Sequence, residues 1–148
     1  MTTDTERLDQ ANACHDDDPA RGAELLRAID DSQLPSDRWP GYAFLLNHVL
    51  GEKLGLWDET LQRQQALLKI ARPAPAAVLW RQAATAARVA GATDLANQMI
   101  QAFADASGAG VERSAEVVQL SAAMFQAPGQ AAAVAGEQAL AALAPLNL

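Results

Sequence analysis

Hydrophobic side chains recur along most of the chain at the three- and four-residue spacing of a buried helix face. The clearest example begins near residue 39, where the apolar positions are Tyr42, Leu45, Leu46, Val49, Leu50 and Leu54. Few segments show the two-residue alternation of a strand. The pattern therefore predicts helices at about residues 4–15, 19–29, 39–54, 57–71, 76–90, 94–106, 111–126 and 130–143.

Turn-forming residues separate the predicted helices. Asp18-Pro19 marks a helix start, because aspartate caps the first turn and proline fits the first helical position. Gly55 and Gly91 each end a helix, and Pro73 stops another. Short connections make consecutive helices antiparallel neighbours. We therefore expect one all-α domain over residues 1–148, with helical hairpins at about 4–30, 39–71, 76–106 and 111–143.

The two glycine turns share a pattern and lie 36 residues apart. One reads LGLWDETL over residues 54–61, and the other reads AGATDLA over residues 90–96. A glycine turn, an acidic residue and a second helix, recurring about every 34–45 residues, are typical of helix-pair repeats. Repeats of this kind stack into extended surfaces that bind other proteins.

The chain resembles the tetratricopeptide repeat family. The segment 54–61 matches best, and Trp80, Ala84 and Ala96 occupy the family's aromatic and small positions in the third hairpin. The sequence departs from the family pattern at Thr60, where alanine is usual, and at His48, where a small residue is usual. The first and last hairpins match less closely. The resemblance implies a right-handed α-solenoid, a superhelix of about four antiparallel hairpins.

The same resemblance implies a concave binding face on the first helix of each hairpin. The candidate partner-binding residues are Asn12, His15, Tyr42, Leu45, Val49, Lys53, Arg81, Thr85 and Arg88, and in the fourth hairpin Ser121 and Phe125. Arg81 and Arg88 are seven residues apart and share a helix face, so together they could bind a carboxylate or an acidic peptide. The alternative is that both are solvated surface residues.

The charge of the chain restricts its partners. The net charge is −7, and residues 1–38 carry ten acidic and four basic side chains. Neither nucleic acid nor an anionic membrane surface is an expected partner, because both require a basic surface. The single cysteine, Cys14, and the absence of a leader or membrane span predict a cytoplasmic protein. The C-terminal hairpin has few charges, which indicates possible self-association.

The sequence contains few residues in arrangements that could support catalysis. Cys14 and His15 are adjacent, so on a helix they point about 100° apart and do not face each other. The run His15 to Asp18 could bind a metal, but a solvated turn is the favoured interpretation. The acidic pair Asp58-Glu59 fits the first turn of a helix. We expect no catalytic residues, no cofactor and no metal.

These observations predict a non-catalytic adaptor that binds a peptide or helix of a partner protein in a concave groove. An alternative is a dedicated cytosolic chaperone or regulator of one client, such as a bacterial secretion substrate. An enzyme with a helical fold is a third possibility.

Overall fold

The computed structural model describes residues 2–126, and every regular element among them is helical, with no strand. This confirms the all-α class. The elements are α1 (Asp4–Cys14), α2 (Pro19–Ala28), the 3-10 turns η1 (Asp31–Gln33) and η2 (Ser36–Arg38), α3 (Trp39–Leu45), the π-helix η3 (Leu46–Lys53), α4 (Trp57–Ile70), α5 (Ala77–Val89), α6 (Thr93–Ser107) and α7 (Val111–Gln126). The predicted helix at 130–143, and with it the proposed C-terminal self-association, lies outside the described residues.

The turns form where the sequence predicts them. The Asp18 carboxylate accepts a hydrogen bond from the Arg21 amide at 3.0 Å and caps α2, with Pro19 in the first turn. Gly55 and Gly91 have φ angles of 70° and 81°, a left-handed conformation that is strained for residues with a Cβ. Each glycine reverses the chain shortly after a helix, so it forms the turn between the two helices of a hairpin.

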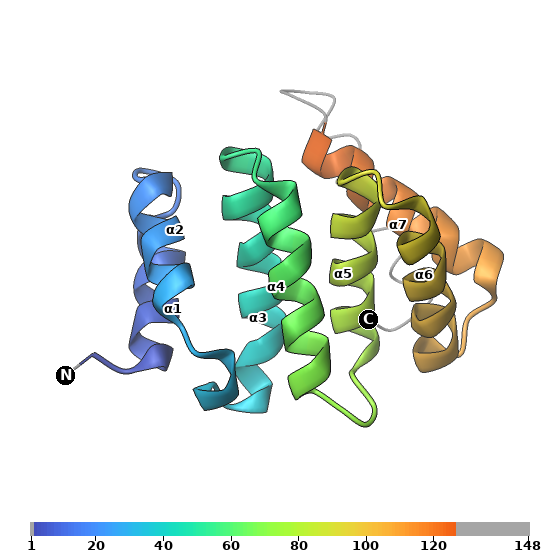
Figure 1. The fold of residues 1–148 in the computed structure, drawn as a ribbon, viewed down its shortest axis with the longest axis horizontal. Coiled ribbons are helices and arrows are strands. Elements are labelled where there is room, and N and C mark those ends of the chain that lie inside the picture. The colour runs from blue at the N-terminus through green and yellow to red at the C-terminus, as the bar shows by residue number, and fades with distance from the viewer. Residues whose placement is uncertain (1, 127–148) are drawn as a thin grey trace.

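The helices pack as neighbours in chain order. Figure 1 shows them in a row, from α1 and α2 near the N-terminus to α6 and α7 at the opposite end. Helix α5 is central: it contacts α4 and α6, its chain neighbours, and also α3 and α7. Small residues allow this close approach, since Ala84 and Ala96 have no exposed surface. The handedness of a superhelix remains a prediction.

The core contains a group of amides that hydrophobic periodicity does not reveal. Asn47 is fully buried and donates from Nδ2 to the Gln82 backbone oxygen at 3.0 Å and to Gln82 Oε1 at 2.7 Å. Gln64 Nε2 donates to Asn47 Oδ1 at 3.1 Å and to the Ala43 carbonyl at 2.8 Å. The three amides therefore link η3, α4 and α5 through satisfied hydrogen bonds in a low-dielectric interior.

The π-helix η3 is the main departure from the predicted continuous helix over 39–54. The Leu54 amide donates to the carbonyl of Val49, five residues earlier, at 3.2 Å, which is the hydrogen-bond spacing of a π-helix. Short π segments are rare and occur often at functional sites. Here the π segment carries His48, Glu52 and Lys53 at the surface beside the end of α1.

Candidate functional site

The predicted groove residues are divided between core and surface. Tyr42, Leu45, Val49 and Thr85 are buried, with relative exposures of 1%, 3%, 0% and 0%. Burial also raises the pKa of Tyr42 to about 12. This corrects the assignment of these side chains to an open groove, and it agrees with the helical spacing, which places Tyr42, Leu45 and Val49 on a buried face. Helical spacing identifies the inward half of each first helix, but the neighbouring helices cover that half.

Arg81 and Arg88 do share one face of α5, but that face is directed at α7. Arg81 Nη1 donates to Ser121 Oγ at 3.4 Å, and Arg88 Nη2 donates to Gln119 Oε1 at 2.6 Å. Arg81 is largely enclosed, its Nε has no hydrogen-bond partner within residues 2–126, and desolvation lowers the pKa of its guanidinium. The two arginines therefore contribute to helix packing, and only Arg88 is well exposed.

A groove of about 210 Å³ lies between α1 and the start of α3. Its lining residues are Leu8, Asp9, Asn12, Asp37, Arg38, Gly41, Phe44 and Leu45. Phe44 is 40% exposed, and Leu45 is buried beneath the same opening. An ion pair crosses the rim, where Arg38 Nη1 donates to Asp9 Oδ1 at 2.7 Å. Of the predicted binding residues, Asn12 and Leu45 belong to this groove.

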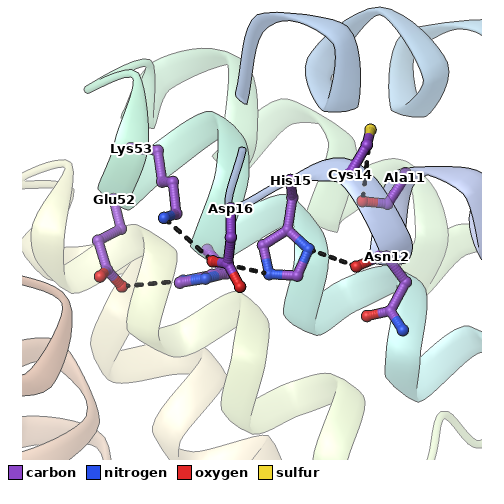
Figure 2. A network of polar contacts seen from close by, with 8 residues as sticks. Ala11, Asn12, Cys14, His15, Asp16, Glu52 and Lys53 are labelled. Atoms are coloured by element: carbon purple, nitrogen blue, oxygen red, sulfur yellow. Dashed lines mark hydrogen bonds and ion pairs between the residues drawn. The ribbon is translucent and has the colours of Figure 1, made fainter. Parts of the chain in front are cut away.

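A polar cluster lies beside the groove and contains two further predicted residues, His15 and Lys53. His15 Nε2 is 3.4 Å from Asp16 Oδ1, and Lys53 Nζ is 3.3 Å from the same oxygen. His48 Nδ1 is 3.2 Å from Glu52 Oε2. In Figure 2 the imidazole of His15 lies between the Asp16 carboxylate and the backbone of Asn12. The turn after α1 and the π-helix thus bring distant polar residues together.

The electrostatics of the cluster centre on Asp16. The hydrogen bond from the Lys53 ammonium, followed by the charge of His15, lowers the pKa of the Asp16 carboxyl below its ordinary value. Asp16 is 75% exposed at its side chain, whereas His15 and His48 are 14% and 19% exposed. The cluster therefore presents an ionised, accessible carboxylate in front of two sheltered imidazoles.

Aromatic rings connect this cluster to the groove and to α7. The His48 ring stacks on Phe44 with centroids 5.5 Å apart, and it meets His15 edge-on at 5.0 Å. Phe125 of α7 follows at 6.4 Å from Phe44, and Trp57 at 5.9 Å from Phe125. Phe44 therefore belongs to both the groove and this row of rings.

Sequence reasoning missed Phe44 as a surface residue and His48 as a partner of His15. A signal for Phe44 does exist, because it is three residues from Gly41 and four from His48 and so shares their helix face. This face is adjacent to the buried face formed by Tyr42, Leu45 and Val49. An aromatic residue on it, such as Phe44, is therefore exposed. The contact between His48 and His15 has no local signal, because it joins two hairpins.

No family model, curated protein or solved structure was found to match this chain. The likeness to tetratricopeptide repeats therefore rests on the sequence positions quoted above. Within residues 2–126, no helix is both long enough and apolar enough to cross a bilayer.

Proposed function

We propose that this chain is a non-catalytic interaction module, similar to tetratricopeptide repeats, that binds a segment of a partner protein. The observation that carries the proposal is the groove between α1 and α3 with Phe44 exposed on its wall. An aromatic ring left 40% exposed beside an apolar recess is a typical anchor point for a partner side chain.

The size of the groove favours a peptide over a small-molecule cofactor. Sites for drug-sized ligands usually enclose about 300–1,000 Å³. The groove has a volume of about 210 Å³. This volume suits one or two apolar side chains inserted from a longer segment, with the remainder of that segment lying across the surface.

The charges around the groove favour a basic flank on that segment. Asp9 and Asp37 line the groove with one base, Arg38, and residues 1–38 carry ten acidic and four basic side chains. Complementary charge speeds association and excludes acidic competitors. We therefore expect an apolar residue next to lysine or arginine in the partner, in contrast to the acidic peptide that the two arginines of α5 first indicated.

The cellular location is part of this proposal. Cys14 is a free thiol that is only partly exposed, and an unpaired cysteine is compatible with a reducing compartment such as the cytoplasm. Under this proposal the chain acts there as an adaptor.

Selection from a displayed library of random peptides tests the proposal. We expect enriched peptides to contain an apolar residue next to lysine or arginine. Their affinity should fall at least about tenfold for Phe44→Ala, the loss typical of a buried aromatic anchor. Leu56→Ala is the matched control, because Leu56 is 38% exposed but lies outside the groove. Equal losses for the two variants, or no enriched peptide, would contradict the proposal.

A further inference from the structure

Three potential metal ligands from two hairpins meet beside the groove. His15 and Asp16 come from the end of α1 and its turn, and His48 comes from η3. One ligand atom from each residue lies within 4.8 Å of the others. Two imidazoles and a carboxylate are a ligand set suited to divalent transition metals such as Zn²⁺. The sequence alone could not assemble it, because His48 is 33 residues from His15.

The outer contacts of both imidazoles match those of metal-bound histidines. His15 Nδ1 is 2.7 Å from the Asn12 carbonyl oxygen, which accepts its proton. His48 Nδ1 is 3.2 Å from the Glu52 carboxylate, which can accept the second. A histidine that donates from one ring nitrogen to a carbonyl or carboxylate offers the other nitrogen to a metal. Both rings are therefore oriented to present Nε2.

The imidazoles are also held in place by packing. The His48 ring stacks on Phe44. The His15 and His48 rings also contact each other in a T-shaped arrangement. On the other side, α2 approaches so closely that a Cβ on Gly22 would lie 3.4 Å from His15 Cβ. Asp16 remains exposed and can adjust. Zn²⁺ needs ligand atoms about 2.0–2.2 Å from the metal, which a small movement of this carboxylate permits.

We propose that Nε2 of His15, Nε2 of His48 and the Asp16 carboxylate bind one divalent transition-metal ion of the Zn²⁺ class. The remaining coordination positions face solvent on the Asp16 side and take water. Lys53 competes for the carboxylate in the metal-free protein, because its ammonium is 3.3 Å from Asp16 Oδ1. Bound metal joins the first hairpin to the second and so stabilises their contact beside the groove.

Titration of the untagged, chelator-treated full chain with ZnCl₂ by calorimetry tests this proposal. We expect saturable binding of one Zn²⁺ per chain, and a higher midpoint of thermal unfolding when Zn²⁺ is present. Asp16→Asn should weaken binding at least about tenfold. Because Asp16 is 75% exposed, this variant should fold normally. The neighbouring substitution Asp17→Asn is the control and should leave the affinity unchanged.

Three further variants sharpen the assignment. His48→Gln should abolish one-to-one binding, and Lys53→Met should tighten it several-fold by removing the competing cation. Cys14→Ser should have no effect, since Figure 2 shows the Cys14 side chain directed away from the His15 imidazole. Absence of saturable Zn²⁺ binding, equal affinity for Asp16→Asn and Asp17→Asn, or a loss in Cys14→Ser would overturn the proposal.

Discussion

The indole ring of Trp57 lies directly on the backbone of Gly51. A Cβ built on Gly51 would lie 2.5 Å from Trp57 Cη2 and 2.6 Å from Cζ3, distances that packed atoms do not adopt. Trp57, the first residue of α4, thus packs against the π-helix η3 that precedes the Gly55 turn. Trp57 in turn meets Phe125 of α7, which extends the contact to the later part of the described chain.

This contact predicts that Gly51→Ala destabilises the protein. The added methyl group must displace the indole, and overpacking of this kind typically costs about 1–3 kcal/mol. Urea unfolding followed by circular dichroism measures the change. Gly41→Ala is the matched control, because its Cβ would meet nothing within 4 Å and alanine favours helix. We expect Gly41→Ala to be neutral or stabilising. Similar free energies of unfolding for the two variants would contradict the packing argument.

The buried amides predict a second effect on stability. Asn47→Ala removes the hydrogen bond that Gln82 Oε1 accepts from Asn47 Nδ2 and one of the two that Gln64 Nε2 donates, the other going to the Ala43 carbonyl. A buried polar group that loses its partner costs about 1–3 kcal/mol, and Gln64 keeps its hydrogen bond to Ala43, so the free energy of unfolding should fall by about 1–3 kcal/mol. Gln62→Ala, at an exposed position of α4, should change it by less than about 0.5 kcal/mol. Equal denaturant midpoints for Asn47→Ala and wild type would exclude a stabilising role for the amide group.

The ion pairs of Glu59 predict a dependence of stability on pH. Glu59 accepts two hydrogen bonds from Arg27, at 2.8 and 2.9 Å, and one from Arg63 at 3.1 Å. The hydrogen bonds from Arg27 lower the pKa of Glu59 from its ordinary value of 4.5 to about 2. Because the folded-state pKa is depressed, the stabilisation is complete above pH 4.5 and is lost as the pH falls towards 2.

Glu59→Gln should therefore lower the free energy of unfolding at neutral pH by about 1 kcal/mol, a modest value because solvent screens these partly exposed pairs. The difference from wild type should shrink steadily as the pH falls below 4.5. Urea midpoints of both proteins at several pH values measure it. Glu116→Gln is the control for loss of one acid, since its pair with Arg113 is local to α7. A difference that stays constant from neutral pH to pH 3 would contradict the role given to Arg27.

Much of the fold could be predicted because its determinants are local. The helix ends follow from Asp18-Pro19, Gly55 and Gly91, whose capping and φ preferences act within a few residues. The π-helix could not be predicted, because its apolar residues keep the three- and four-residue spacing of an ordinary α-helix. The amide group was hidden as well, since polar residues on the inward face break the apolar pattern that identifies a core.

The candidate site was predictable only in part, for a related reason. Periodicity places Tyr42 and Val49 on the correct helix but does not say how far the adjacent hairpin covers them. The surface residues Asn12, His15 and Lys53 do lie together, beside Phe44, which the sequence analysis did not select. Their grouping depends on contacts between the first and second hairpins, and a single sequence does not encode those contacts locally.

The groove between α1 and α3 is tested most directly by filling it. Gly41 lines the groove and a Cβ there would meet nothing within 4 Å, so Gly41→Leu should add bulk at the groove wall and leave the fold intact. We would measure the affinity of an enriched basic–apolar peptide by fluorescence anisotropy for wild type, Gly41→Leu and Gly110→Leu, the last adding the same side chain at an open position outside the groove. We predict that Gly41→Leu loses at least about tenfold in affinity while Gly110→Leu binds as wild type does. Undiminished binding by Gly41→Leu would contradict the account.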